Sequence, residues 1–213
     1  TQTQSIATGT ADPISFFLKF RTEQTGTFEI LKSSEDGQKL GFLFQIDDQN
    51  GYRCVFPTDE DGQILIPLLP GEYVVSEQEL DRYRDIQEMK IQIRENETTQ
   101  VQIENKLKKG KIRIQKTVLN PLNQVNFNEF NGVFQIYSTK YSSFQTAPEL
   151  YRDQMKTDSS GSAVSKELPL GSYRLHQISS NPNIAFATDE IVVIDDDLQT
   201  VTIPLKNQLQ QCR

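Results

Sequence analysis

The chain carries the same series of short motifs twice, and this duplication limits the folds that it can adopt. The first copy reads GTFEILK from Gly26, FQI from Phe44, TDEDG from Thr58, PGEYVVSE from Pro70, and VQIEN ending at Asn105. The second copy reads GKIRIQK from Gly110, FQI from Phe134, TDSSG from Thr157, LGSYRLHQ from Leu170, and IPLKN ending at Asn207. A chain of 213 residues has room for two small domains, so we expect one domain per copy.

Most of the apolar residues alternate with polar ones, in short stretches rich in β-branched residues and bounded by Gly, Pro, Asn and Asp. A period of two residues is typical of strands that bury one face. The pattern therefore predicts an all-β chain of two tandem domains, each an Ig-like β-sandwich or a barrel. Helical periodicity is weak, and its best candidate is a short surface helix from Ala147 to Met155, in an insertion that lengthens the second copy.

The domain boundaries follow from the junctions. We predict a tail of a preceding domain, or a linker, at 1–24, a first domain at 25–108 and a second at 109–213. Only KLKK separates Asn105 from Gly110, and domains joined so closely should stack end to end. Ser15 to Arg21 resembles a closing strand and could be the tail of a third, truncated domain. Because no signal peptide opens the chain, we interpret it as a segment of a longer protein whose export signal and anchor lie elsewhere.

Composition argues against several classes of partner. The net charge is −7, and no window gathers Lys and Arg with aromatic residues, so nucleic acid is a poor partner. No apolar run approaches the roughly 18 residues of a membrane span, so we expect no membrane insertion in this segment.

Cys54 in an apolar stretch and Cys212 in a polar tail do not make a disulfide framework. We interpret Cys54 as a half-buried thiol, and we expect no cofactor and no metal.

The order and register of these motifs, found twice over nearly all of residues 26–209, resemble the CnaB-type repeats of Gram-positive surface adhesins and pilins. These are also called prealbumin-like or collagen-adhesin B-type domains. The resemblance implies two prealbumin-like sandwiches that form a structural stalk segment of an extracellular, cell-wall-anchored protein. The implied partners are the neighbouring domains of the same longer chain, and the implied role is not that of an enzyme that turns over a substrate.

The family also implies an intramolecular isopeptide bond between a lysine on the first strand and an asparagine on the last, promoted by a glutamate on a central strand. Carried over by position, the lysine is Lys32, the asparagine is Asn105 and the promoter is Glu77. A lysine amine attacks only when neutral, and burial favours that form. A buried carboxyl group stays protonated, so it can polarise the carboxamide and give a proton to the leaving ammonia.

The second copy departs from this pattern at one position. It retains Lys116 and Asn207 for a possible second crosslink, but Gln177 stands where the first copy has Glu77. A glutamine cannot shuttle a proton, so a bond made by the family route is doubtful here. Another acid, such as Glu167 or Glu190, could reach the site, although no register supports either. If no bond forms, Lys116 must be exposed or paired, because a buried unpaired ammonium is costly.

An alternative function is a ligand-binding module that recognises a host matrix protein or a glycan through the insertion of the second copy. Aromatic loops on a rigid scaffold are suited to recognition. The candidate residues are Tyr137, Tyr141, Phe144 and Tyr151.

Two weaker hypotheses concern other chemistry. His176, the single histidine, could act as a base for a cysteine in a hydrolase or transglutaminase, but no local signature supports this. The acidic run Asp195 to Asp197 could suggest calcium, but it lacks the EF-hand spacing, and consecutive acids on a turn are usually solvated.

Overall fold

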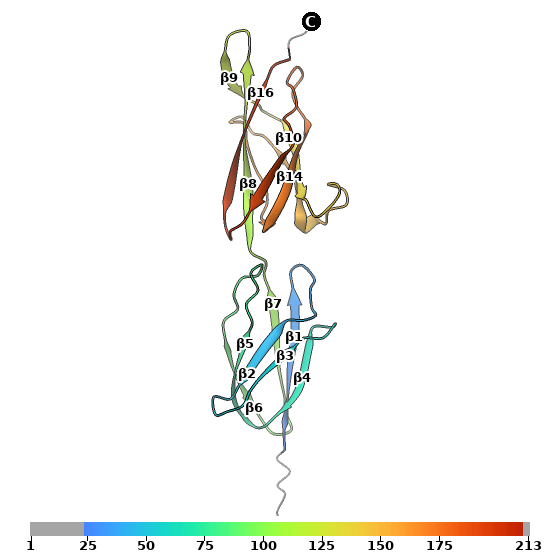
Figure 1. Ribbon diagram of the computed structural model, residues 1–213, viewed down its shortest axis with the longest axis vertical. Coiled ribbons are helices and arrows are strands. Elements are labelled where there is room, and N and C mark those ends of the chain that lie inside the picture. The colour runs from blue at the N-terminus through green and yellow to red at the C-terminus, as the bar shows by residue number, and fades with distance from the viewer. Residues whose placement is uncertain (1–23, 211–213) are drawn as a thin grey trace, which may run out of the picture.

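The computed structural model of the chain describes residues 24–210. The predicted closing strand from Ser15 to Arg21 therefore lies outside the described residues, and so does Cys212. Within them, two β-sandwiches are stacked end to end, and the last strand of one is followed closely by the first strand of the next (Figure 1). The prediction of an all-β chain with two tandem sandwiches is confirmed.

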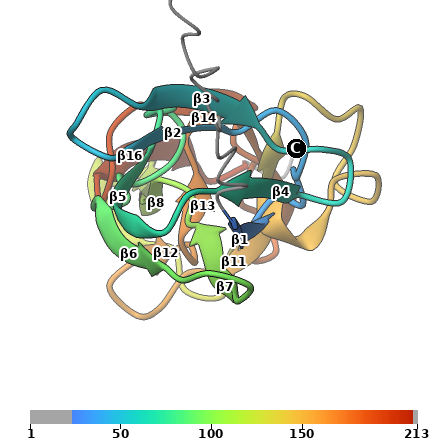
Figure 2. The same ribbon diagram turned by 90° about the horizontal axis from the view of Figure 1, so that it is seen from below.

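The first sandwich pairs a sheet of three strands with a sheet of four. The first sheet has the order β4-β1-β7, and the second has the order β3-β2-β5-β6. Viewed along the long axis, β2 and β3 lie across the domain from β1, β4 and β7 (Figure 2). The bounds of these strands are β1 Gly26–Ser34, β2 Leu43–Asp47, β3 Arg53–Pro57, β4 Gln63–Leu68, β5 Gly71–Glu77, β6 Met89–Ile93 and β7 Thr98–Asn105.

The second sandwich repeats this plan around a longer first strand, β8. One sheet has the order β11-β10-β14-β15, and in the other β8 pairs with β9, β12 and β13 and, in parallel, with β16. The bounds are β8 Lys109–Asn120, β9 Val125–Asn128, β10 Val133–Ser138, β11 Arg152–Lys156, β12 Ser162–Val164, β13 Leu168–Pro169, β14 Gly171–Ser179, β15 Glu190–Ile194 and β16 Thr200–Gln208.

In each sandwich the first strand runs parallel to the last. Thus β1 pairs with β7, placing Lys32 beside Ile103 and Ser34 beside Asn105. Likewise β8 pairs with β16, placing Lys116 beside Leu205. A lysine and an asparagine far apart in sequence therefore lie on adjacent strands, two residues apart in register.

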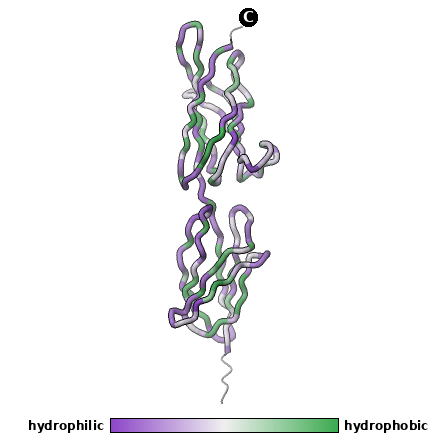
Figure 3. The backbone as a smooth tube through the Cα atoms, viewed as in Figure 1, coloured by the Kyte–Doolittle hydropathy of each residue, from purple (hydrophilic) through white to green (hydrophobic). Residues whose placement is uncertain are grey.

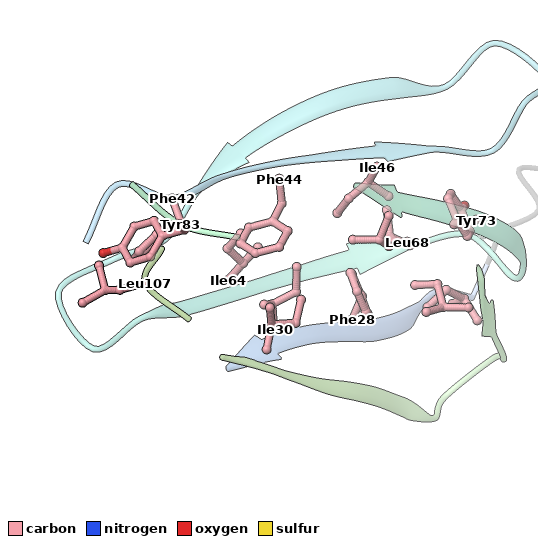
Figure 4. Packing of buried hydrophobic residues seen from close by; sticks show 14 residues of the cluster. Phe28, Ile30, Phe42, Phe44, Ile46, Ile64, Leu68, Tyr73, Tyr83 and Leu107 are labelled. Carbon is pink, nitrogen blue, oxygen red and sulfur yellow. The ribbon is translucent and has the colours of Figure 1, made fainter. Parts of the chain in front are cut away.

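The cores form where the inward residues of facing sheets meet, as period-two alternation requires. Hydrophilic and hydrophobic residues alternate along both domains (Figure 3). In the first domain, Phe28 and Ile30 of β1 point toward Phe44 and Ile46 of β2, and all four are fully buried (Figure 4). The second domain has a separate cluster built on Ile112, Ile114, Phe134 and Ile136, so each sandwich has its own core.

The TDxxG motif is a turn that fixes the backbone of the lysine that recurs in the two copies. Gly62 has φ +82° and Gly161 has φ +74°, a left-handed conformation that favours glycine. The carbonyl oxygen of Gly62 accepts a hydrogen bond from the Lys32 N–H at 2.7 Å, and that of Gly161 accepts one from the Lys116 N–H at 2.8 Å. The repeated motif therefore positions both lysines.

A short joint connects the two sandwiches. Arg84 donates two hydrogen bonds to Asp197, at 2.9 and 3.1 Å, and Asp197 also accepts one from the Lys109 N–H at 2.8 Å. The Lys109 ammonium forms an ion pair with Glu35. Leu150, in the second-domain insertion, packs against the core cluster of the first domain. These contacts link residues from both domains, so the stacking rests on more than the connecting chain.

Two sequence predictions are wrong. The segment from Ala147 to Met155 contains only a 3-10 turn, Glu149–Tyr151, because the chain after it pairs with β10 as strand β11. Cys54 is exposed rather than half-buried, because β3 is an edge strand that turns most of its side chains to solvent. The predicted domain bounds stay a prediction; β7 ends at Asn105 and β8 begins at Lys109.

Candidate crosslinking sites

In the first domain, the structure brings Lys32, Glu77 and Asn105 together at the interior of the sandwich. Lys32 lies on β1 and Asn105 on β7 of one sheet, while Glu77 ends β5 in the opposite sheet. The Lys32 Nζ lies 3.6 Å from Glu77 Oε2, and Asn105 Nδ2 donates a hydrogen bond of 2.5 Å to Glu77 Oε1. Glu77 therefore contacts both the amine and the carboxamide.

Burial sets the electrostatics of this group. The side chain of Lys32 is fully excluded from solvent and that of Glu77 is 5% exposed. Burial lowers the pKa of Lys32 to about 8, against an opposing effect of the Glu77 charge. Burial also raises the pKa of Glu77, although the Asn105 hydrogen bond and Lys32 oppose the shift. Both shifts favour the neutral forms, an amine that can attack and an acid that can donate a proton.

Two polar atoms of this group lack a hydrogen-bond partner. They are Glu77 Oε2 and Asn105 Oδ1, both buried. An unpaired buried acceptor is costly, and one proton on the Glu77 carboxyl would supply the missing donor. The ring of Phe42 covers the amine, with Lys32 Nζ 4.4 Å from the ring centre, so the site is closed to water on that side.

The second domain contains a different buried group, made of Lys116, Gln177 and Glu129. All three residues are among the buried polar residues, and the side chains of Lys116 and Glu129 are fully excluded from solvent. Lys116 Nζ lies 3.7 Å from Glu129 Oε2 and donates a hydrogen bond of 3.3 Å to Gln177 Oε1. Gln177 Nε2 in turn donates to Glu129 Oε2 at 3.4 Å. The buried ammonium is therefore paired.

Sequence reasoning missed Glu129, which lies in the loop between β9 and β10. The hairpin of β8 and β9 places it there: Thr117 pairs with Asn128, and the next residue, Glu129, donates its N–H to the Lys116 carbonyl oxygen at 3.4 Å. The turn at Asn120 and Pro121 between two alternating stretches was the sequence signal for this hairpin. Extending its register would have placed Glu129 opposite Lys116.

A glycine makes room for the Glu129 carboxylate. Gly132 corresponds to Phe42, because each donates its N–H to the threonine of the TDxxG motif. A Cβ added at Gly132 would lie 3.1 Å from Glu129 Cδ. In the first domain the ring of Phe42 lies beside the lysine amine. In the second domain the Glu129 carboxylate lies beside it instead.

The Gln177 carboxamide is held at both ends. Its oxygen Oε1 accepts a hydrogen bond of 2.8 Å from the Ala187 N–H, besides the one from Lys116. Its nitrogen donates to the Ser179 carbonyl oxygen at 3.1 Å, besides Glu129. Burial lowers the pKa of Lys116 to about 8, opposed by the charge of Glu129.

Asn207 is engaged elsewhere. It occupies the position on β16 that Asn105 occupies on β7, but its side-chain amide donates a hydrogen bond to the Ala185 carbonyl oxygen. Within residues 24–210, no hydrogen bond joins Asn207 to Lys116. The two acids suggested by the sequence do not reach this group either: Glu167 forms an exposed pair with Lys111, and Glu190 is exposed on β15.

The aromatic residues of the insertion pack on one another or on cationic side chains. The rings of Tyr141 and Tyr151 lie 5.8 Å apart, and the Arg152 guanidinium lies 5.1 Å from the ring of Phe144. Tyr137, in contrast, lies on β10, and no aromatic contact joins it to the other three in the described part of the chain. All four side chains are only partly exposed.

The remaining sequence candidates have ordinary contacts. His176 Nδ1 lies 2.6 Å from Asp189 Oδ1 at an exposed position, while Cys54 belongs to the other domain. Asp197 is engaged by Arg84 at the joint. No cluster of side chains suited to a metal ion occurs among residues 24–210. In the same residues, no helix has the length and apolar character that crossing a membrane requires.

The fold and the buried lysine groups define a protein of tandem β-sandwiches, each with a buried lysine beside a carboxylate. Residues 26–107 match the family model of the SpaA prealbumin-like fold domain, which confirms the resemblance for the first domain. No curated protein sequence matches the chain significantly.

Among solved structures, the *Bacillus anthracis* TIE protein is similar at 21% identity and a TM-score of 0.66, over 87% of this chain and 34% of that one. The chain thus spans about a third of that structure. The C-terminal fragment of the pilus adhesin SpaC from *Lactobacillus rhamnosus* GG is similar at 11% identity and a TM-score of 0.57, over 88% of this chain and 99% of that one. At these identities the similarity establishes the fold.

Proposed function

We propose that the chain is a structural stalk segment of a Gram-positive cell-surface adhesin or pilus-like protein, stabilised by a self-formed isopeptide bond between Lys32 and Asn105. The observation that carries the proposal is the buried contact of Glu77 with both reacting groups, at 3.6 Å to Lys32 Nζ and 2.5 Å to Asn105 Nδ2. On this proposal the protein is not an enzyme, because each site reacts once with its own chain.

The reaction is an amide exchange within the domain. The neutral Lys32 amine attacks Cγ of Asn105, a carbon–nitrogen bond forms, and the bond from Cγ to Nδ2 breaks to release ammonia. Burial raises the pKa of Glu77 and so favours the protonated acid, which polarises the carboxamide and passes a proton to the leaving nitrogen, while the attacking nitrogen returns one proton to Glu77. The unpartnered Asn105 Oδ1 is the atom on which negative charge develops, and the Glu77 proton is its donor.

The position of the bond is suited to bearing load. Lys32 and Asn105 lie near the ends of two parallel strands, at the side of the first domain from which the chain passes to the second. A pulling force that enters at β1 would pass through the new bond and leave through β7, without loading residues 33–104. The proposed partners are the neighbouring domains of the same chain, and the proposed location is the cell exterior, with an anchor to the cell wall.

A ligand-binding module remains the alternative function. Two of its candidate residues, Tyr141 and Tyr151, pack against each other, and Leu150 of the same insertion packs on the core of the first domain. The insertion therefore contributes to the joint between the domains, which favours the stalk over recognition of a host protein or glycan.

Peptide mapping by tandem mass spectrometry tests the proposed bond. Because trypsin does not cleave after a modified lysine, the bond joins peptide 22–39 to peptide 95–106, with the loss of one ammonia. The Glu77→Gln variant should fold, as judged by circular dichroism, and should give the two peptides unlinked. Unlinked peptides from the unaltered protein would contradict the proposal.

A further inference from the structure

The buried group of the second domain has the same three chemical components as that of the first, carried by different residues. An amine, a carboxamide and a carboxylate are present in both. In the first domain the central-strand residue, Glu77, is the acid, and in the second the central-strand residue, Gln177, is the carboxamide. The acid of the second group is Glu129, from a loop that the first domain does not use for this purpose.

Three short distances connect the side chains of Lys116, Gln177 and Glu129. Glu129 Oε2 lies 3.7 Å from Lys116 Nζ and 3.4 Å from Gln177 Nε2, and Lys116 Nζ lies 3.3 Å from Gln177 Oε1. A carboxylate that contacts an amine and an amide nitrogen through the same oxygen can take a proton from one and give it to the other. Proximity of this kind replaces an encounter in solution with a reaction inside the folded domain.

The carboxamide is also activated. The Ala187 N–H donates to Gln177 Oε1 at 2.8 Å, so a fixed backbone dipole faces the oxygen on which negative charge would develop during attack. The leaving nitrogen, Gln177 Nε2, is oriented by the Ser179 carbonyl oxygen at 3.1 Å. Glu129 itself is held by Ser180 Oγ at 2.5 Å and by the Asn181 N–H at 3.2 Å, both on Oε1, which leaves Oε2 for the amine and the amide.

We propose that the second domain forms an isopeptide bond between Lys116 and Gln177, with Glu129 as its acid–base group. In this reaction the Lys116 ammonium gives a proton to Glu129 Oε2, and the neutral Nζ attacks Cδ of Gln177. The new bond joins Nζ to Cδ, and the bond from Cδ to Nε2 breaks. Nε2 receives the proton held by Glu129 and the second proton of the attacking nitrogen, and it leaves as ammonium. No oxidant or further reactant is required.

The bond would differ in topology from the one proposed for the first domain. Lys32 and Asn105 lie on adjacent strands of one sheet, whereas Lys116 on β8 and Gln177 on β14 lie in facing sheets. The second bond would therefore tie the two layers of the sandwich through its core. Asn207, which stands at the position of the family's crosslinking asparagine, takes no part in this bond, since its amide donates a hydrogen bond to the Ala185 carbonyl oxygen.

Tryptic mapping of the full chain separates this proposal from every competing product. A Lys116–Gln177 bond joins peptide 114–140 to peptide 175–206 and loses one ammonia. A bond to Asn207 would instead join 114–140 to 207–213. An amide with Glu129 would lose one water within peptide 114–140, because both residues lie on it. The first product supports the proposal, and either of the others, or no modification, overturns it.

Two variants test the roles of Asn207 and Glu129 in forming the second bond. Asn207→Ala should leave the link between 114–140 and 175–206 complete, whereas a family-type bond would be lost. Glu129→Gln keeps hydrogen-bonding groups in place but cannot carry a proton, so the link should be absent at a time when the unaltered protein is fully linked. Its fold is checked by the amide NMR spectrum; a complete link in this folded variant would contradict the role of Glu129. The Lys32–Asn105 bond is detected on other peptides, 22–39 and 95–106, so the same digest reports on the two proposed bonds independently.

Discussion

The Glu77 carboxylate and the Asn105 carboxamide face each other from opposite sheets of the first sandwich, joined by a hydrogen bond of 2.5 Å. The same carboxylate lies 3.6 Å from the buried Lys32 amine. This arrangement links three strands that are distant in sequence.

Loss of the first-domain bond should lower the stability of that domain. A Lys32–Asn105 bond closes a loop of roughly 74 residues, which by chain entropy is worth about 4 kcal/mol. The Asn105→Ala variant should therefore lose about 4 kcal/mol in the free energy of unfolding, measured with urea and a probe of the first domain. Asn207→Ala is the matched control and should leave the first domain unchanged. An equal loss in both variants would contradict the bond.

The stability of the unlinked first domain should depend on pH. Burial lowers the pKa of Lys32 from 10.5 to about 8, so between these values the unfolded chain binds more protons than the folded one. Stability should therefore rise with pH in this window, by about 3 kcal/mol at most, and should be lowest below pH 8. Urea unfolding of Asn105→Ala at several pH values measures the effect.

The control for this pH dependence removes the titrating group. The double variant Asn105→Ala with Lys32→Met carries no amine at this position, so its stability should lack the rise between about pH 8 and 10.5. The difference between the two variants isolates Lys32 from the tyrosines and exposed lysines that titrate in the same range. Parallel curves for both variants would show that Lys32 is not the cause.

The sequence predicted the fold from local rules, whereas the residues of the first group were carried over from the family resemblance. Alternation predicts strands, and the TDxxG turn fixes the backbone of Lys32 through Gly62. The acid of the second group could not be predicted in this way. Glu129 is buried by a hairpin register and by the absence of a side chain at Gly132, and neither effect appears in the repeat pattern. The sequence did indicate that an unlinked Lys116 must be either exposed or paired, and in the structure it is buried and paired with Glu129.

Gly132 should be intolerant of a side chain because of Glu129. The added Cβ of Gly132→Ala would lie 3.1 Å from Glu129 Cδ and 3.2 Å from Thr157 Oγ1, tighter than ordinary contacts. We expect a loss of about 1–3 kcal/mol in the stability of the second domain. In a Glu129→Ala background the cost of Gly132→Ala should be smaller, since one of the two close neighbours is gone. Additive costs in this double-mutant cycle would show that the two residues are not coupled.

Asp197 should control the rigidity of the joint. It accepts hydrogen bonds from Arg84 of the first domain and from the Lys109 N–H, whereas the nearby Asp195 is exposed. Asp197→Ala should therefore broaden the distribution of angles between the domains, measured by residual dipolar couplings, with little change in the stability of either. Asp195→Ala is the matched control. Unchanged couplings in Asp197→Ala would mean that the remaining contacts, such as Lys109 with Glu35, are sufficient.

The two proposed bonds predict different responses to a pulling force. With Lys32 joined to Asn105, force bypasses residues 33–104 and the first domain should not extend. With Lys116 joined to Gln177, residues 117–176 are bypassed, but residues 178–208 can still peel away from β8. The second domain should then lengthen by roughly 100 Å, at about 3.4 Å per residue, in single-molecule force spectroscopy. The Glu129→Gln variant should give roughly 300 Å for the same domain, because no bond then shortens the path. An inextensible second domain would instead indicate a bond at Asn207, near the end of β16.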